Sequence, residues 1–212
     1  MTNKTVYTIG HSTHSIEKFI ELLENHQINC LIDVRSTPYS KYNPQYNKEL
    51  LQKALVQKDI IYAHFGSEFG ARYTSKMMLD EKGRVDFDKV RASDGFQQGI
   101  IRLEKALSQG YGVTLMCSEK DPLACHRFSM ISYELIKEGF DVLHIMEDGI
   151  EIQNQDLEKR MLQKYEKSIP QSDLFNQVTP EEQLDIAYHL CGQEVAFRPA
   201  KYLSPNEEEN TL

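Results

Sequence analysis

The stretch GVTLMCSEKDPLACHRFSMISYELIKEGFDVLHI, residues 112–145, decides the fold class. It begins and ends with short apolar runs, GVTLMC and FDVLHI, that predict strands. Between these two runs, Asp121 and Pro122 favour the start of a helix, because Asp caps helix N-termini and Pro suits the first helical position. Gly139 favours the end of that helix. The stretch therefore predicts the strand–helix–strand unit of a parallel sheet.

The same alternation of strand and helix extends toward the N-terminus. The apolar runs TVYTI (5–9), CLIDV (30–34) and DIIYAHF (59–65) predict three further strands. Apolar residues at helical spacing lie between these runs. Because strands that alternate with helices indicate the α/β class, we expect a Rossmann-like three-layer fold with a mostly parallel sheet.

The chain length predicts one domain with an appendage. The protein has 212 residues, of which 40% are hydrophobic and 26% charged, as in ordinary globular proteins. We expect an α/β domain over 1–150, with a lid-like insertion near the weakly patterned residues 71–94. Helical patches predict a small helical C-terminal extension over 151–203, and a polar, acidic composition predicts a disordered tail over 204–212.

Charge and cysteine content limit the classes of partner and compartment. The 24 basic and 32 acidic side chains give a net charge of −8, which argues against a general nucleic-acid coat or an anionic-membrane binder. The N-terminus has no apolar signal segment, and no apolar run reaches the ~18 residues that span a bilayer. The four irregularly spaced cysteines favour reduced thiols, so we expect a cytoplasmic protein without a membrane partner.

Polar and reactive residues follow the predicted strands. Ligands of open parallel sheets bind beyond the carboxyl ends of the strands, so these residues are candidates for one shared site. The candidates are Gly10, His11, Ser12, Asp33, Arg35, Ser36, Arg72, Cys117, Glu119, Cys125, His126 and Arg127. Their convergence predicts a site, although no single motif among them identifies a reaction.

Arginines are the main candidates for binding an anion. Arg35 and Arg127 each present a rigid fork that suits phosphate or carboxylate, and Arg72 would complete an anion pocket. Asp33 and Arg35 share one strand face, so a mutual ion pair is the structural alternative for both. The further anion- or substrate-binding candidates are Gly10, Ser12, Ser36 and Cys125.

Four side chains are candidates for the chemistry itself. His11 is a candidate acid or base, because an unperturbed imidazole titrates near neutral pH. Cys117 is a candidate nucleophile, since a helix N-terminus stabilises a thiolate. Glu119 is a second acid–base candidate, and His126 completes the set. Each has a structural alternative as a turn-fixing histidine, a buried thiol or a paired carboxylate.

Zinc is another use of these residue types. Cys117, Cys125 and His126 carry ligands that suit zinc, and His11 or His64 could complete the set. The neighbours Cys125 and His126 would diverge by about 100° on a helix, however, and the usual pairwise ligand spacing is absent. We therefore assign no metal ligands and keep a metal-supported domain as an alternative.

Five short motifs lie at or beside the predicted strands, namely TIGHS (8–12), DVRSTP (33–38), HFGSEFGAR (64–72), CSEKDPLACHR (117–127) and GFDVLHI (139–145). In this order they resemble the domain of unknown function family 488, over most of residues 5–150. The later segments LEKRML and DIAYHL are similar to the usual ending of that family. Ala71 departs from the pattern, which often has a second glycine there. The resemblance implies a fold and a site, and no particular reaction.

The leading hypothesis from these observations is an enzyme, a hydrolase or transferase, acting on a phosphate-bearing small molecule, a nucleotide or a nucleic-acid end. A non-catalytic nucleotide or nucleic-acid binding module is the main alternative. No glycine-rich loop of the NAD or ATP type occurs, so neither cofactor is expected. The oligomeric state is not indicated by the sequence.

Overall fold

The computed structural model describes residues 4–172 and 177–202. A six-stranded sheet with strand order β3-β2-β4-β1-β5-β6 forms its centre. The strands are β1 (Thr5–Gly10), β2 (Cys30–Asp33), β3 (Ile61–His64), β4 (Val113–Cys117), β5 (Asp141–Ile145) and β6 (Glu151–Gln153). All neighbouring strands pair in parallel except β6, which runs antiparallel to β5. The expected mostly parallel α/β fold is therefore confirmed.

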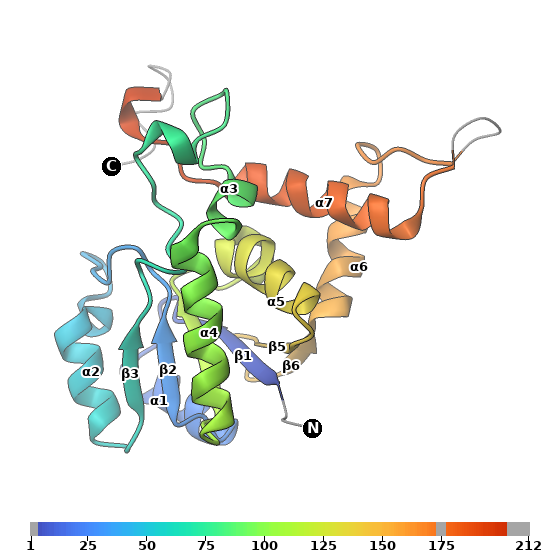
Figure 1. Ribbon diagram of the computed structural model, residues 1–212. Helices are drawn as coiled ribbons and strands as arrows, with labels where there is room; N and C mark the ends of the chain where they lie inside the picture. The colour runs from blue at the N-terminus through green and yellow to red at the C-terminus, as the bar shows by residue number, and fades with distance from the viewer. Residues whose placement is uncertain (1–3, 173–176, 203–212) are drawn as a thin grey trace.

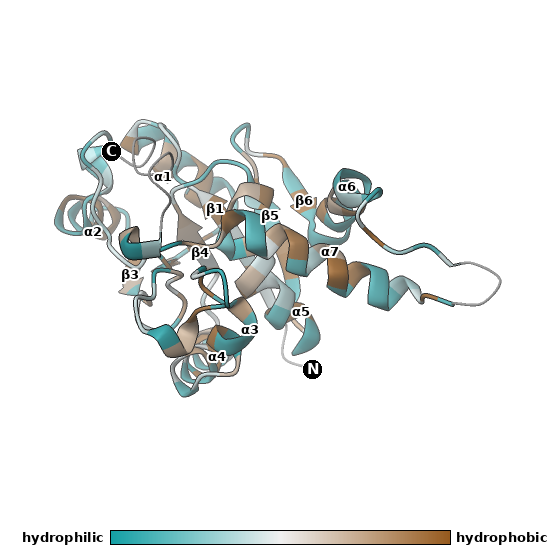
Figure 2. Cartoon of the chain, turned by 90° about the horizontal axis from the view of Figure 1, so that it is seen from above, coloured by the Kyte–Doolittle hydropathy of each residue, from teal (hydrophilic) through white to brown (hydrophobic). Residues whose placement is uncertain are grey.

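Helices cover both faces of the sheet, as the three-layer prediction requires (Figure 1). They are α1 (Ile16–Asn25), α2 (Lys48–Val56), α3 (Phe87–Arg91), α4 (Asp94–Ser108), α5 (Tyr133–Lys137), α6 (Asn154–Tyr165) and α7 (Pro180–Val195). Seen from above, α1 and α4 lie on opposite sides of the strands (Figure 2). Single-turn 3-10 segments add Pro44–Tyr46, Lys76–Met78, Pro122–Ala124 and Ala200–Tyr202.

Alternating strand side chains build a separate core on each face. Leu115 of β4 packs with the core that contains Phe96 and Leu103 of α4. Its neighbour Met116 packs into the opposite core, which contains Phe19 of α1. Successive strand side chains point to opposite faces, so the continuous apolar runs of the sequence serve both layers at once.

The segment between β4 and β5 differs from the single helix predicted over it. Asp121 does cap a helical turn, accepting from Leu123 N at 3.0 Å, but this turn is only the 3-10 segment Pro122–Ala124. Cys125 then returns to an extended backbone, with φ −140° and ψ 143°. A wide π-helical segment, Arg127–Ser132, precedes α5. The chain is therefore broken at Cys125, within the CHR motif.

Residues 71–94, expected as a lid-like insertion, pack into the body of the protein. Leu79 and Val85 form an isolated antiparallel bridge, and both side chains are buried in the core beneath α4. Val85 N also donates to the carbonyl oxygen of Phe197 at 2.9 Å. This segment therefore connects the residues after α7 to the main domain.

The predicted C-terminal helices are present as α6 and α7, which project to one side (Figure 1). They pack on the segment after the CHR motif through a third core that includes Phe128, Leu157, Met161 and Tyr188. The tail predicted over 204–212 lies outside the described residues. Among residues 4–172 and 177–202, no helix combines the length and apolar character needed to cross a bilayer.

Candidate functional site

A cavity of about 370 Å³ opens at the carboxyl ends of β2 and β4. The register explains its place: Gly10 pairs with Cys117 and Asp33 with Met116, so the residues after these three strands leave the sheet at one level. The predicted site residues that line the cavity are Arg35, Ser36, Arg72, Cys117, Glu119, Cys125 and His126. The remaining predicted residues lie behind its wall.

Gly10 forms part of that wall because it has no side chain. A Cβ at this position would lie 1.9 Å from the carbonyl oxygen of Glu119. The loop after β4 therefore contacts the end of β1 directly. The adjacent Ser12 has a positive φ of 49°, and its N–H donates to the carbonyl oxygen of Ser118 at 2.9 Å. Both residues position the β4 loop and do not reach the cavity.

His11 is buried and stacks on Tyr46, with ring centroids 4.0 Å apart. Its Nδ1 lies 2.9 Å from the carbonyl oxygen of Ser12, and its Nε2 lies 3.4 Å from Nη1 of Arg35. Burial, with a smaller contribution from Arg35, lowers the pKa of His11 to about 4. A neutral imidazole in this place supports the turn and orients Arg35, which was the structural alternative for this residue.

Arg35 makes the ion pair foreseen with Asp33. Its Nε and Nη2 donate to the two carboxylate oxygens at 2.9 and 2.6 Å, and Nη2 also donates to the carbonyl oxygen of Tyr46 at 2.8 Å. Tyr62 donates its hydroxyl to Asp33 at 2.9 Å. These contacts hold the guanidinium rigidly, and within the described residues Asp33 is the only carboxylate that contacts it. Arg35 therefore lines the cavity as a preoriented cation.

Arg127, predicted as a second fork for the anion, is instead fully buried and does not line the cavity. Its Nη1 and Nη2 donate to the carbonyl oxygens of Glu119 and Lys120 at 2.5 and 3.0 Å. The predicted fork is thus directed at the protein backbone. Its place is explained by the break at Cys125, which turns the following residue toward the interior.

Arg72 supplies the second cationic side chain of the cavity. It is exposed, and its backbone N–H donates to Ser36 Oγ at 2.9 Å. Its guanidinium lies 5.5 Å from the ring centre of Phe197. Within the described part of the chain it has no carboxylate partner. Arg72 is therefore free to pair with an anion opposite Arg35.

Four polar atoms meet at the floor of the cavity. Glu119 Oε2 accepts from the thiols of Cys117 and Cys125 at 2.9 and 3.1 Å. His126 Nδ1 lies 3.7 and 3.8 Å from the same two sulfur atoms. Both cysteines are buried, whereas the imidazole is half-buried and Glu119 stands at the exposed end of its loop. The structure therefore brings together three of the four residues predicted for chemistry, with Cys125 in the place of His11.

The two thiols differ in their electrostatic surroundings. The hydrogen bond to Cys125 and burial raise the pKa of Cys117. Burial opposes ionisation of Cys125 too, but the hydrogen bond from Cys117 and the charges of Arg127 and His126 hold its pKa below the ordinary value. Burial of the carboxylate raises the pKa of Glu119. Negative charge in the cluster is thus favoured on Cys125.

The sequence argument against a shared metal ion depended on a helix that does not form. Because Cys125 is extended, its sulfur and His126 Nδ1 point to the same place and do not diverge as helical neighbours. His11 and His64, considered as completing ligands, are directed elsewhere, with His64 Nε2 2.9 Å from the carbonyl oxygen of Arg35. Residues Cys117, Cys125 and His126 form a possible ligand set without them.

Several cavity residues lie outside the set of predicted site residues. Thr37, Tyr39 and Ser118 lie on the loops after β2 and β4, close to predicted residues. Their positions beside DVR and C-S-E were the available signal. Phe197 comes from the segment after α7, and no pattern in the sequence connects it with the strand ends.

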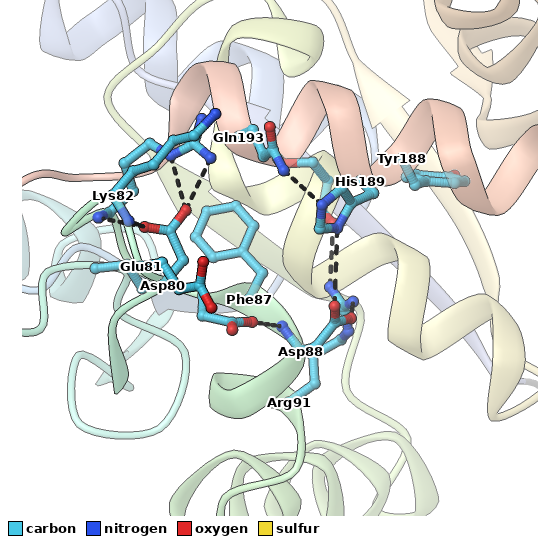
Figure 3. A pocket seen from close by; sticks show the side chains of 14 residues that line it. Asp80, Glu81, Lys82, Phe87, Asp88, Arg91, Tyr188, His189 and Gln193 are labelled. Carbon is cyan, nitrogen blue, oxygen red and sulfur yellow. Dashed lines mark hydrogen bonds and ion pairs between the residues drawn. The ribbon is translucent and has the colours of Figure 1, made fainter. Parts of the chain in front are cut away.

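A second cavity, of about 270 Å³, lies between residues 80–91 and α7 (Figure 3). Several of its charged side chains are paired with one another. Arg84 contacts Asp80 at 2.8 Å, and Arg91 forms an ion pair with Asp88. His189 lies 3.8 Å from Asp88 on the other wall. The contact of His189 with Asp88 joins the two segments that form the cavity.

Comparison with known protein families gave one match. The model of the family described as "Domain of unknown function DUF488" matches residues 15–133, which is more than half of the chain. This range contains the DVRSTP, HFGSEFGAR and CSEKDPLACHR motifs. No curated protein and no solved structure matched the sequence.

Proposed function

The chain belongs to the DUF488 family of domains of unknown function, and we propose that it is an enzyme acting on a small phosphate-bearing molecule, a nucleotide or a nucleic-acid end. One observation carries the proposal. The cavity at the strand ends places the cationic edges of Arg35 and Arg72 beside the cluster of Cys117, Glu119, Cys125 and His126. The groups proposed to bind the substrate and those proposed to react with it thus line the same cavity.

The cationic part of the cavity suits an anion better than a neutral ligand. Arg35 is held in place by Asp33, so little side-chain entropy is lost when Nη1 binds an oxygen atom. Arg72 brings an unpaired guanidinium, and Ser36 and Ser118 add hydroxyl groups to the lining. Two guanidinium groups and hydroxyl donors are a common means of binding phosphate.

The reactive part of the cavity favours an enzyme over a simple binding module. Two buried thiols in contact with an imidazole and a carboxylate are expensive to desolvate, and an anion-binding site does not need them. Acid–base and nucleophilic chemistry commonly uses these three residue types. A volume of about 370 Å³ falls in the range of small-molecule sites, which favours a mononucleotide-sized ligand or a chain end.

The site would work in a reducing compartment. The four cysteines are free, and two of them belong to the reactive cluster. Reduced thiols are typical of the cytoplasm, so we place the protein there.

Thermal-shift measurements with inorganic phosphate, pyrophosphate, nucleotides and sugar phosphates test the proposal. A ligand of the folded state raises the melting temperature, and Arg72→Ala should abolish the rise. Lys58→Ala is the matched control, because it removes one positive charge just before the amino end of β3. The cavity lies at the carboxyl ends of the strands. If no anion shifts the wild-type protein, or if both variants lose the shift equally, the anion site is wrong.

Turnover separates the enzyme from the binding module. Any compound that binds should be incubated with wild type and with Glu119→Gln, followed by product analysis. An enzyme loses turnover in the variant and keeps much of its affinity. A ligand that binds tightly and is never converted would instead favour a non-catalytic binding module.

A further inference from the structure

We propose that Cys117, Cys125 and His126 bind a zinc ion at the floor of the strand-end cavity, with Glu119 beside the ion and the fourth ligand position open to the cavity. The evidence for the zinc site is the geometry of these side chains. The role of the ion in the reaction rests on the proposed function, since a cation there would lie beside the bound anion. Soft thiolate ligands together with an imidazole select zinc over the harder divalent cations.

The donor atoms are already spaced as zinc ligands. The two Sγ atoms and His126 Nδ1 lie within 4.8 Å of one another, and Nδ1 is 3.7 and 3.8 Å from the sulfurs. Zinc bonds to sulfur at about 2.3 Å and to nitrogen at about 2.0 Å, so tetrahedral ligands stand about 3.6 Å apart. The two sulfur–nitrogen distances therefore need adjustments of only a few tenths of an ångström.

His126 is oriented as a zinc ligand by its second nitrogen. Nε2 lies 3.3 Å from the carbonyl oxygen of Val34 and donates its hydrogen there. This contact leaves the lone pair of Nδ1 directed at the sulfur atoms. Metal-binding histidines usually donate their other ring N–H to a carbonyl or carboxylate in this way, which fixes the ring and its tautomer.

The surroundings of Cys125 favour a charged sulfur. The backbone N–H of Arg127 donates to Cys125 Sγ at 3.4 Å, and the buried Arg127 guanidinium places positive charge behind the loop. Glu119 Oε2 lies 2.9 and 3.1 Å from the two sulfurs, so its carboxylate stands beside the ligand set. Three protein ligands with a fourth position facing a cavity are typical of zinc sites that act on a substrate.

When bound, zinc would supply a Lewis acid for an oxygen of the anionic substrate. Arg35 and Arg72 would hold the remaining oxygens, because they line the same cavity. Glu119 contacts both sulfur atoms, so it would be the acid–base group beside the ion.

Metal analysis of the purified protein is the direct test. We expect about one zinc ion per chain after growth with added zinc. After the zinc is removed with a chelator, titration with Co²⁺ should produce the intense charge-transfer bands of thiolate-bound, tetrahedral cobalt. A protein that binds no zinc, or that binds Co²⁺ without thiolate bands, would overturn the proposal, and this result does not depend on any variant.

Substitutions locate the ion. Cys125→Ser and His126→Gln should weaken zinc binding by more than about a hundredfold, since loss of second-shell partners alone weakens it about 10- to 100-fold. Cys191→Ser is the matched control, because that thiol is buried but is not among the ligand atoms, and it donates to the carbonyl oxygen of Leu123 at 3.4 Å. Equal zinc binding by Cys125→Ser and Cys191→Ser would contradict the assignment. Circular dichroism of each variant verifies that it is folded.

The two proposals can fail separately. Zinc bound without any anion shift would leave the metal site standing and refute the substrate class. Phosphate binding that survives complete zinc removal, in a protein that takes up no Co²⁺, would refute the metal site and keep the anion pocket. Arg72→Ala should reduce anion binding and leave zinc content unchanged, since Arg72 is not among the ligands.

Discussion

The guanidinium of Arg127 donates to the carbonyl oxygen of Glu119, and the same loop carries the carboxylate that contacts both cysteine sulfurs. The residues of the CHR motif therefore lie on both sides of this loop. Cys125 and His126 face the cavity, whereas Arg127 holds the opposite side of the loop from within the core. The position of Glu119 therefore depends on Arg127, a side chain that does not line the cavity.

Arg127→Met should destabilise the protein while preserving the apolar volume of the side chain. The change removes the donors of two partly buried carbonyl oxygens, at up to about 1–3 kcal/mol each. We expect a loss of roughly 2–4 kcal/mol in the free energy of unfolding, measured by urea denaturation. Arg72→Ala, on the surface, should change it by less than about 0.5 kcal/mol. Equal stability of the two variants would contradict this account.

Gly10→Ala tests the close contact between the end of β1 and the β4 loop. The added Cβ meets the carbonyl oxygen of Glu119 at 1.9 Å, so the loop must move. We expect a loss of about 1–3 kcal/mol, the usual range for overpacking, together with weaker binding at the cavity. Gly95→Ala in α4 is the control. Its new Cβ would meet only Ser67 O, at 3.5 Å, and alanine favours a helix by about 1 kcal/mol. A stable Gly10→Ala protein with unchanged binding would show that the contact is unimportant.

The fold was readable from the sequence because its signals are local. The apolar runs at 112–117 and 140–145 became β4 and β5, and the helix signals between β1 and β2 became α1, where Ser15 accepts from Lys18 N. The edge at which ligands bind followed from strand direction alone. These inferences use short-range patterns, which the tertiary structure did not override.

The arrangement of side chains within the site was harder to predict from the sequence, because it depends on backbone turns that composition does not encode. The break at Cys125 reversed two expectations, since it united Cys125 with His126 and removed Arg127 from the cavity. The contribution of Phe197 depends on how α7 packs on the segment after the CHR motif. Such long-range packing has no counterpart in the periodicity of a single sequence.

His144 should make stability depend on pH. Asn154 Nδ2 donates to Glu158 and Tyr188, so its Oδ1 is left to accept from His144 Nε2 at 3.1 Å, and Thr8 donates to Nδ1 at 2.8 Å. Burial in this neutral form lowers the pKa of His144 to about 3. Between this value and about 6.5, the unfolded chain binds a proton that the folded chain does not, so stability falls as the pH falls.

The comparison of wild type with His144→Gln isolates this contribution. Each histidine of this kind reduces the free energy of unfolding by about 1.4 kcal/mol per pH unit on acidification below its unfolded pKa. The variant should be less stable at about pH 7, and the gap should narrow as the pH falls toward 5. Urea denaturation at several pH values measures both curves. Parallel curves would mean that His144 has the same pKa in the folded and unfolded chains.

Tyr39 offers a test of whether the ligand carries a nucleobase. Its side chain lines the cavity and is 66% exposed, so an aromatic face is available beside Arg35 and Arg72. Stacking of a base on an aromatic ring contributes about 1–3 kcal/mol. Tyr39→Ala should therefore weaken the binding of a nucleotide by about tenfold or more, and leave the binding of inorganic phosphate unchanged.

Tyr42 is the matched control for this measurement, because it lies on the same loop, is 79% exposed and does not line the cavity. Tyr42→Ala should bind nucleotide and phosphate as the wild type does. Calorimetric titration of the three proteins with both ligands gives the comparison. If Tyr39→Ala loses phosphate and nucleotide affinity equally, the residue shapes the cavity and does not stack on a base. The substrate would then be recognised by its anionic group alone, which favours a sugar phosphate or another small phosphate-bearing molecule over a nucleotide.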